Sequence, residues 1–287
     1  MRYEKPESTA EAVRLLANEA GLARVLAGGT DLLVQMKSGM VEPDLVVDIK
    51  QIAGMRTVTP EAGGFRIGAA VSGAELGENA EVVAQWPGVV EGFNLIGSTQ
   101  VQGRCTMAGN LCNASPAGDA VPSLVAANAT ARVAGPNGER DVTIEQIPVG
   151  PGRISLAKGE FITSIFLPAR PARSSDAYLR FIPRTEMDIA VASAAVNLTL
   201  GEDGTVTAAR VAVGAVAPTV RLVEPAAQAL IGTKLDEDAL AALAAACSAA
   251  ANPINDKRGT IEYRTHVVGV LAKRAALIAY ERAGGRK

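Results

Sequence analysis

The chain has 287 residues, of which 48% are hydrophobic, 20% are charged and only 3% are aromatic, and its formal net charge is −2. This length exceeds one minimal core and predicts two domains, or one elongated domain with a C-terminal cap. Basic residues are dispersed among acidic ones, which argues against nucleic-acid binding. No run of about 18 apolar residues occurs, so no membrane span is expected. The N-terminus lacks an apolar signal core, which favours a cytoplasmic protein.

Three cysteines and one histidine limit the metal chemistry of this chain. Cys105, Cys112 and Cys247 form no Cys-x-x-Cys pair, which argues against a disulfide framework and against an iron–sulfur cluster, since a cluster normally takes four thiolates. A single histidine, His266, excludes a His-x-x-x-His metal pattern. We interpret His266 as a surface residue and expect any redox metal on another chain.

The N-terminal segment predicts a strand, a glycine turn, a helix and a second strand in succession. A first helix begins with the capping box Ser8–Glu11 and ends at Gly21. The next expected elements are a strand over 24–27, a turn over 28–31, a helix over 32–38 and a strand over 45–49. A glycine pair is informative in this context, because it joins a strand to a helix N-terminus.

The rest of the chain predicts an α+β arrangement. Before a linker over 168–175, we expect strands over 65–70 and 161–167, helices over 82–95 and 120–127, a glycine-rich region over 97–118, and an Asn-Gly hairpin between 131–134 and 140–144. After the linker, we expect strands over 177–182, 189–200 and 205–216, then helices over 225–231, 238–251 and 262–282. This order predicts a small sheet that carries helices.

The turn Gly28-Gly29-Thr30-Asp31 has the composition of an anion site. Glycines let backbone N–H groups converge and let an anion approach closely, and the dipole of the following helix favours negative charge. These properties suit a pyrophosphate. The alternative interpretation is a tight strand-to-helix turn without a ligand.

A second segment, Thr106 to Asp119, is rich in small and hydrogen-bonding residues and is predicted to be poor core material whose amides need partners. Asp119 precedes a predicted helix, so it either caps that helix or accepts a hydrogen bond from a ribose hydroxyl. Neither Gly-x-Gly-x-x-Gly nor Gly-x-x-x-x-Gly-Lys-Ser/Thr occurs in the sequence, which argues against a Rossmann or P-loop nucleotide site.

Four motifs in order carry a family resemblance over essentially the whole chain: AGGTDLLVQMKSG, GNLCNASPAGDAVPSL, PRTEMDIAVASAAV and the stretch from Ile261 to Leu277. With them, the chain resembles the FAD-binding medium subunit of the xanthine dehydrogenase and aerobic carbon monoxide dehydrogenase family of molybdenum hydroxylases. The resemblance implies an α+β fold. Residues 1–170 would form an FAD-binding domain of the vanillyl-alcohol oxidase and p-cresol methylhydroxylase type, with two α/β subdomains over about 1–57 and 58–170. Residues 176–287 would form a carbon monoxide dehydrogenase flavoprotein-like C-terminal domain with a small antiparallel sheet and helices.

The resemblance also implies which residues bind FAD non-covalently, and it implies no catalytic residue on this chain. The first loop, Ala27 to Leu32, would wrap the FAD pyrophosphate, and the second loop, Thr106 to Asn110, would join it from the other side. Asp119 would hold a ribose or ribityl hydroxyl. Arg180 would stand where some relatives carry a lysine near the flavin ring. Arg184 and Asp188 match the segment beside the isoalloxazine. The implied cofactor-binding residues are Ala27, Gly28, Gly29, Thr30, Asp31, Leu32, Ile96, Thr106, Ala108, Gly109, Asn110, Cys112, Asp119, Ile162 and Arg180.

Two positions depart from the family pattern. Met107-Ala108 stands where a Leu/Ile-Gly pair is frequent, and Arg180 replaces the lysine. Arginine keeps the positive charge but changes the hydrogen-bond geometry, and this charge would favour an anionic reduced flavin. The cysteine-bearing insertion of hydroxybenzoyl-CoA reductases is missing.

The implied function is electron transfer within a complex. A large subunit with a molybdenum cofactor would oxidise the substrate, a small subunit with two [2Fe-2S] clusters would relay electrons, and the FAD here would pass them to NAD, a quinone or dioxygen, in what is expected to be a dimer of heterotrimers. The alternatives are a free-standing FAD oxidoreductase, for which no acid–base pair is found near the loops, and a scaffold protein, which would leave both loops unexplained. Purines, N-heterocycles, carbon monoxide and aldehydes stay open as substrates. The Gly-Gly-Thr-Asp turn differs from the Gly-Gly-His-Ser form that is associated with carbon monoxide enzymes, which favours heterocycles as substrates.

Overall fold

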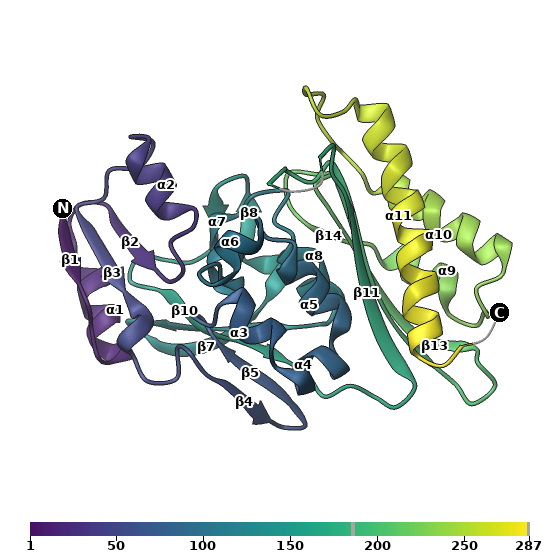
Figure 1. The fold of residues 1–287 in the computed structure, drawn as a ribbon, viewed down its shortest axis with the longest axis horizontal. Coiled ribbons are helices and arrows are strands. Elements are labelled where there is room, and N and C mark those ends of the chain that lie inside the picture. Colours follow the sequence, from purple (N-terminus) through teal and green to yellow (C-terminus); the bar gives the residue numbers. More distant parts are fainter. Residues whose placement is uncertain (185–186, 286–287) are drawn as a thin grey trace.

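A computed structural model describes residues 1–184 and 187–285. Three sheets follow one another along the long axis of the molecule, and the two chain ends lie at opposite ends of that axis (Figure 1). The N-terminal sheet has the order β1-β3-β2, the central sheet β4-β5-β10-β6-β7, and the C-terminal sheet β11-β12-β13-β14. This mixture of helices and separate sheets confirms the predicted α+β class.

The N-terminal sheet is parallel throughout. Its strands are β1 (Arg2–Glu4), β2 (Ala23–Leu26) and β3 (Leu45–Asp48), and its helices are α1 (Thr9–Asn18) and α2 (Leu32–Lys37), followed by the short η1 (Ile49–Gln51). The succession β2, turn, α2, β3 is as predicted, whereas β1 was not. The Ser8 hydroxyl caps α1 by accepting from the N–H of Glu11, but the Glu11 carboxylate accepts from Glu7 rather than from Ser8, so the capping box is incomplete. The helix ends at Asn18, before Gly21.

The central sheet is antiparallel. Its strands are β4 (Val58–Glu61), β5 (Gly64–Gly68), β6 (Thr130–Gly135), β7 (Gly138–Thr143) and β10 (Phe161–Leu167), with η2 (Ile144–Gln146), β8 (Pro148–Gly150) and β9 (Arg153–Ile154) between β7 and β10. Gly135 pairs with Gly138. The hairpin loop is therefore Pro136-Asn137, and the expected Asn-Gly turn is wrong by one residue, because Gly138 lies in the strand with a φ of 101°.

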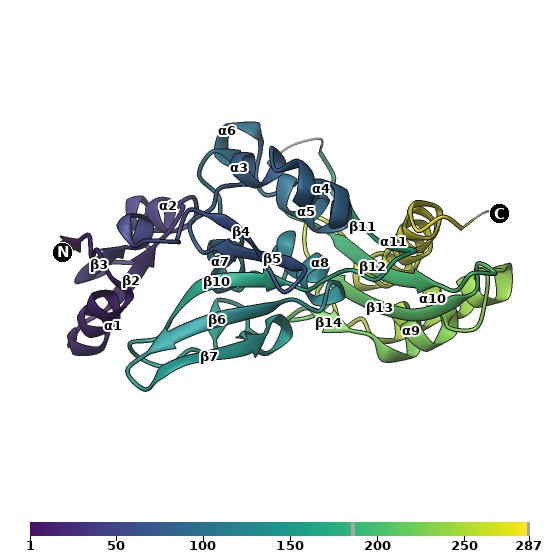
Figure 2. The ribbon, with the colours of Figure 1, turned by 90° about the horizontal axis from the view of Figure 1, so that it is seen from below.

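Six short helices connect β5 to β6, and Figure 2 shows α3 to α6 over one side of the central sheet. They are α3 (Gly73–Gly77), α4 (Ala80–Gln85), α5 (Pro87–Asn94), α6 (Thr99–Gln102), α7 (Met107–Asn113) and α8 (Ala120–Ala126). The single helix predicted over 82–95 is two helices, since Pro87 forces Trp86 out of the helical region.

The glycine-rich region over 97–118 holds α6 and α7. The description of the segment from Thr106 to Asp119 as poor core material is wrong. Met107, Ala108 and Leu111 are buried. Small residues here let α7 pack closely against its neighbours, so the segment contributes to the core through close approach rather than through large side chains.

The C-terminal sheet lies between two sets of helices. Its strands are β11 (Ser174–Phe181), β12 (Ala192–Leu200), β13 (Val206–Gly214) and β14 (Arg221–Leu222), all antiparallel. The helices α9 (Glu224–Leu230), α10 (Glu237–Ala249) and α11 (Ile261–Arg282) lie on one side, and α5 and α8 pack on the other (Figure 1). This antiparallel sheet with helices was predicted, although the strand expected from Ile189 begins at Ala192.

Polar side chains of the C-terminal sheet bind the ends of α5 and α8. Asp176 Oδ2 accepts a hydrogen bond from the N–H of Val89 at the start of α5, at 3.0 Å. At the C-terminal end of α8, Arg210 donates to the carbonyl of Val125 at 3.1–3.2 Å, and Asn197 donates to the carbonyl of Ala126 at 3.2 Å. An acid at a helix N-terminus and a cation at a helix C-terminus are the favourable arrangement for the helix dipole. We call this contact the helix–sheet interface.

Candidate functional site

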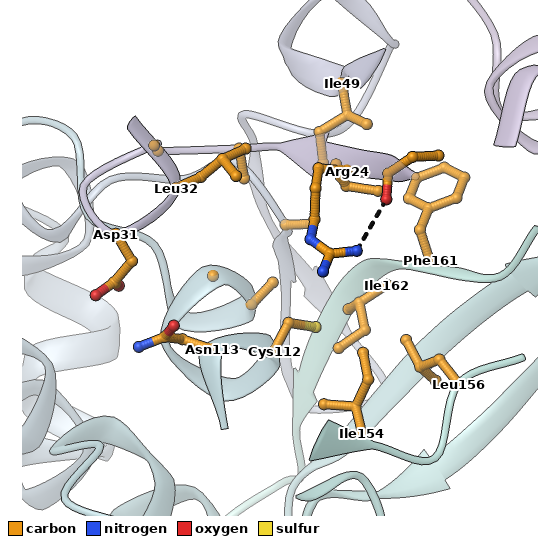
Figure 3. A pocket seen from close by; sticks show the side chains of 18 of the residues that line it. Arg24, Asp31, Leu32, Ile49, Cys112, Asn113, Ile154, Leu156, Phe161 and Ile162 are labelled. Atoms are coloured by element: carbon orange, nitrogen blue, oxygen red, sulfur yellow. Dashed lines mark hydrogen bonds between the residues drawn. The ribbon is translucent and has the colours of Figure 1, made fainter. Parts of the chain in front are cut away.

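A cavity of about 780 Å³ opens between the N-terminal sheet and the central sheet. Its wall combines β2 and the glycine turn with the second predicted loop and with the chain from β9 into β10 (Figure 3). Thirteen of the fifteen predicted cofactor residues line it. They are Ala27, Gly28, Gly29, Thr30, Asp31, Leu32, Ile96, Thr106, Ala108, Gly109, Asn110, Cys112 and Ile162.

Glycine is required twice in the first turn, for two different reasons. Gly29 has a φ of +83°, which L-residues rarely adopt. Gly28 lies so close to the second segment that a Cβ there would stand 1.9 Å from the carbonyl oxygen of Arg104. The glycine pair therefore both bends the chain and lets the two loops, which are far apart in sequence, approach one another.

The backbone amides of this turn are free. Within the described hydrogen bonds, the N–H groups of Gly28, Gly29, Thr30 and Asp31 donate to no protein acceptor, and only the carbonyls of Gly29 and Asp31 are used, by Leu33 and Gln35 of α2. Adjacent amides without acceptors at the wall of a cavity form a concave anion site. The turn therefore joins a strand to a helix and also offers the donors that an anion site needs.

A cluster behind the turn fixes its orientation. Lys50 donates from Nζ to the carbonyl oxygen of Ala27 at 3.1 Å and forms an ion pair with Asp48 at 2.7 Å. Tyr3 donates its hydroxyl to the same carboxylate. Burial alone would raise the pKa of Asp48, but the hydrogen bonds from Lys50 and Tyr3 outweigh it and hold the pKa below its usual value. Lys50 thus fixes the Ala27 carbonyl at the start of the turn, whose residues line the cavity.

The second predicted loop is the first turn of α7. Thr106 caps this helix, since its Oγ1 accepts from the N–H of Gly109 at 3.0 Å. Ala108 lies inside the helix, where alanine is the most favourable residue, so the Met107-Ala108 departure is compatible with the geometry. Gln35 of α2 donates to the Oδ1 of Asn113 at 3.1 Å and links the two sides of the cavity.

The charge on the cavity wall is mixed. Desolvation raises the pKa of Asp31. Desolvation likewise raises the pKa of the Cys112 thiol to about 12, so Cys112 is a neutral, apolar contact. Arg24 and Lys158 bring positive charge to the wall. Sequence reasoning missed Arg24, although a charged residue in an otherwise apolar strand before the glycine turn is a signal that could have found it.

The remaining two predicted residues lie outside the cavity lining and bind one another. Arg180 donates from Nη1 to Oδ2 of Asp119 at 2.5 Å, and the Tyr178 hydroxyl donates to Oδ1 of Asp119 at 2.9 Å. Burial raises the pKa of Asp119 to about 6, against the lowering effect of Arg180 and Tyr178. Asp119 has helical backbone angles and makes no capping hydrogen bond to α8, so its interpretation as an N-cap is wrong. Asp119 stands one residue before Ala120, whose N–H donates to Asn110 of the cavity wall.

The segment expected beside the flavin ring is held by ion pairs. Asp188 accepts from Arg184 at 3.1 Å and from Arg258 at 3.2 Å. Thr185 and Glu186, within the same motif, lie outside the described residues. His266 is exposed on α11, as predicted, and Cys105 and Cys247 are buried.

The wall fits a flavin dinucleotide. Free amides of the turn match a diphosphate, the glycine positions leave it room to approach, and a cavity of about 780 Å³ is within the usual range for bound cofactors. The fold and the site together define a class of protein that binds a dinucleotide through two backbone loops.

Comparisons with known proteins agree with this class. Residues 1–170 match the model for the FAD binding domain in molybdopterin dehydrogenase, and residues 177–279 match the CO dehydrogenase flavoprotein C-terminal domain. The chain therefore belongs to the molybdopterin dehydrogenase family, as an FAD-binding oxidoreductase subunit. No helix over residues 1–184 and 187–285 is long and apolar enough to cross a membrane.

Several relatives span the whole chain. The carbon monoxide dehydrogenase medium chain of Afipia carboxidovorans is 34% identical and covers 98% of this chain and 97% of its own length. The xanthine dehydrogenase FAD-binding subunit of Escherichia coli O157:H7 is 28% identical, with 99% and 97% covered. Among solved structures, a Cu,Mo-CO dehydrogenase chain gives a TM-score of 0.94 at 33% identity over 98% of both chains. Quinoline 2-oxidoreductase from Pseudomonas putida 86 gives 0.90 at 25% identity over 99% of this chain and 98% of its own.

Proposed function

We propose that the amides over Gly28–Asp31 and the first turn of α7 hold the diphosphate of FAD between them. The observation that carries this proposal is the row of unused N–H groups at the wall of the cavity, with Gly28 packed against the backbone at Arg104. Bound there, the flavin supplies reversible two-electron chemistry. The protein supplies binding, orientation and exclusion of water.

We further propose roles for the residues that surround the amides. Ile96, Cys112 and Ile162 provide uncharged contacts for the rings, since all three line the cavity. Asp119 keeps lone pairs beyond those used by Tyr178 and Arg180. With one of them it accepts a ribose or ribityl hydroxyl. Arg180 acts near the ring as one half of a buried ion pair, so the net charge that it brings there is small.

The domain division is also a proposal. An FAD-binding domain over 1–170, with subdomains over about 1–57 and 58–170, and a C-terminal domain over 176–287 are supported by two separate hydrophobic clusters. One spans mainly the first two sheets, and the other lies between β11–β13 and α9–α11. The connection between them is short, and Arg170, directly before it, stacks on Trp86, 3.8 Å from the ring centroid.

The relatives' names support a role beside other subunits, since they describe medium chains, medium subunits or FAD-binding subunits. We propose that this chain works with a large subunit that carries a molybdenum cofactor and a small subunit with two [2Fe-2S] clusters, as a dimer of heterotrimers in the cytoplasm. Electrons from the clusters pass through FAD to NAD, a quinone or dioxygen. The relatives' names include carbon monoxide, xanthine, nicotine and glyceraldehyde enzymes. Substrate choice would therefore rest with the large subunit.

Visible spectra of the chain alone and with its partner subunits test this proposal. We expect a flavin spectrum that substrate bleaches only when the partners are present. Bleaching of the isolated chain by substrate would support a free-standing oxidoreductase instead. If neither the isolated chain nor the complex acquires a protein-bound flavin spectrum after FAD is added, the proposed site is contradicted.

A further inference from the structure

The cavity has a polar part and an apolar part, and Arg24 lies at their border. Figure 3 shows Asp31 and Asn113 on one side, Ile154 and Ile162 on the other, and the guanidinium of Arg24 directed into the space between them. The polar part adjoins the free amides of the glycine turn. The apolar part lies beyond it, toward β9 and β10.

Arg24 is held in this direction by its strand. Ala23 and Val25 pack against the hydrophobic core, and successive side chains of a strand point to opposite faces, so Arg24 points away from that core. The guanidinium of Arg24 donates one hydrogen bond, from Nη1 to the carbonyl oxygen of Ala23 at 3.1 Å. Among the residues that the structure describes, no carboxylate oxygen lies within 4.0 Å of its guanidinium.

A guanidinium has five N–H donors and a permanent positive charge. Arg24 therefore brings to the cavity a charge and several donors that the protein does not use. Glu160 also lines the cavity but is paired with Arg140 at 2.9 Å, so it does not neutralise Arg24. Lys158 is the other cation among the lining residues, and it is exposed.

We infer that Arg24 binds the ADP half of FAD and makes the site selective for FAD over FMN. This inference rests on the proposed FAD site. The turn offers a doubly charged diphosphate neutral amides and, at Asp31, a carboxylate, but no cation. Arg24 supplies the counter-charge beside them. An adenine in the apolar part would lie against the guanidinium plane, which stacks well on flat rings. FMN has no adenosine and leaves this part of the cavity empty.

The test compares flavin binding by the assembled complex carrying wild-type, Arg24→Gln or Arg24→Lys chains, after removal of the flavin. Titration with FAD and FMN gives each Kd from flavin fluorescence, and ADP serves as competitor. We expect Arg24→Gln to raise the Kd for FAD about ten- to hundred-fold, as for loss of a charge-assisted hydrogen bond. The Kd for FMN should change less than about two-fold by the same reasoning. ADP should compete with FAD in the wild type and compete far less in the variant.

Arg24→Lys should recover part of the affinity, because it restores the charge but not the planar fork. Arg14→Gln is the matched control. Arg14 lies on α1 outside the cavity lining, exposed and 4.0 Å from Glu11, so the same change in net charge should leave both Kd values unaltered. Unchanged thermal unfolding of the flavin-free variants shows that they fold.

An Arg24→Gln complex that binds FAD as tightly as the wild type would overturn the inference. So would an equal loss of FAD and FMN affinity, since Arg24 would then act on the flavin phosphate common to both. A wild-type complex that binds no FAD would contradict the proposed function itself, which separates the two failures.

Discussion

The cavity wall and the helix–sheet interface are both built from helix ends and polar side chains, but they satisfy their backbone groups in opposite ways. At the interface, Asp176 meets the start of α5, and Arg210 and Asn197 meet the end of α8. At the cavity, the amides over Gly28–Asp31 meet no acceptor within residues 1–184 and 187–285. The residues of this turn are half-buried or exposed, so their amides are open to a ligand, and under the proposed function that ligand is the diphosphate of FAD.

The same comparison separates two kinds of charge. Asp176 is buried, pairs with Arg170 at 2.8 Å, and its pKa is raised by burial despite that pair. Arg24, at the cavity, has no such partner in the part of the chain that the structure describes. Changes at the interface should therefore alter folding and leave cofactor affinity intact, whereas changes at the cavity should do the reverse.

The largest effect is expected from Asp176→Ala. This change leaves Arg170 as an uncompensated buried charge against Trp86 and removes the acceptor at the start of α5. The free energy of unfolding should fall by about 3–5 kcal/mol, as measured by urea denaturation. The exposed Glu139→Ala, on β7, is the control and should change it by less than about 0.5 kcal/mol. A comparable loss in both variants would show that the interface acid has no special role.

Gly28→Ala should act on the cofactor. The added Cβ would meet the carbonyl oxygen of Arg104 at 1.9 Å, so the two loops must separate. We expect the Kd for FAD to rise by about a hundred-fold or more, which corresponds to about 2.7 kcal/mol, as read from FAD content and fluorescence titration of the complex. Gly103→Ala is the control, because a Cβ there meets nothing within 4 Å. Full FAD affinity in Gly28→Ala would show that the close approach of the loops is not needed.

Lys50→Gln should have a smaller effect on the same Kd. It removes the hydrogen bond that holds the Ala27 carbonyl from behind the turn, but it leaves every amide in place. Loss of one charged hydrogen bond to a positioning group predicts about a ten-fold weaker Kd for FAD. Lys37→Gln, at the exposed end of α2, should leave the Kd unchanged. If both variants bind FAD alike, the turn holds its orientation without Lys50.

The sequence predicted local features well and contacts between distant segments poorly. The glycine turn between β2 and α2, the ends of β10 and the three C-terminal helices follow from turn residues and periodicity, which are local signals. The helical nature of the 106–113 segment was missed, because its small residues give little periodicity. The Asp119–Arg180 pair joins residues 61 positions apart, and the caps on α5 and α8 come from another sheet. No local pattern could have indicated these contacts.

An effect no larger than that of Lys50→Gln is expected on the flavin potential, and it concerns the pair that joins the two regions. Arg180→Gln removes the positive charge but leaves Asp119, whose burial already raises its pKa to about 6 and favours its protonation once Arg180 is lost. The net change in charge is then small. We expect the two-electron potential to fall by about 30 mV, equivalent to about 1.4 kcal/mol, in a spectroelectrochemical titration of the complex. Arg180→Lys keeps the charge and should stay near the wild-type potential. An unchanged potential in Arg180→Gln would show that the pair holds the interface together without acting on the flavin.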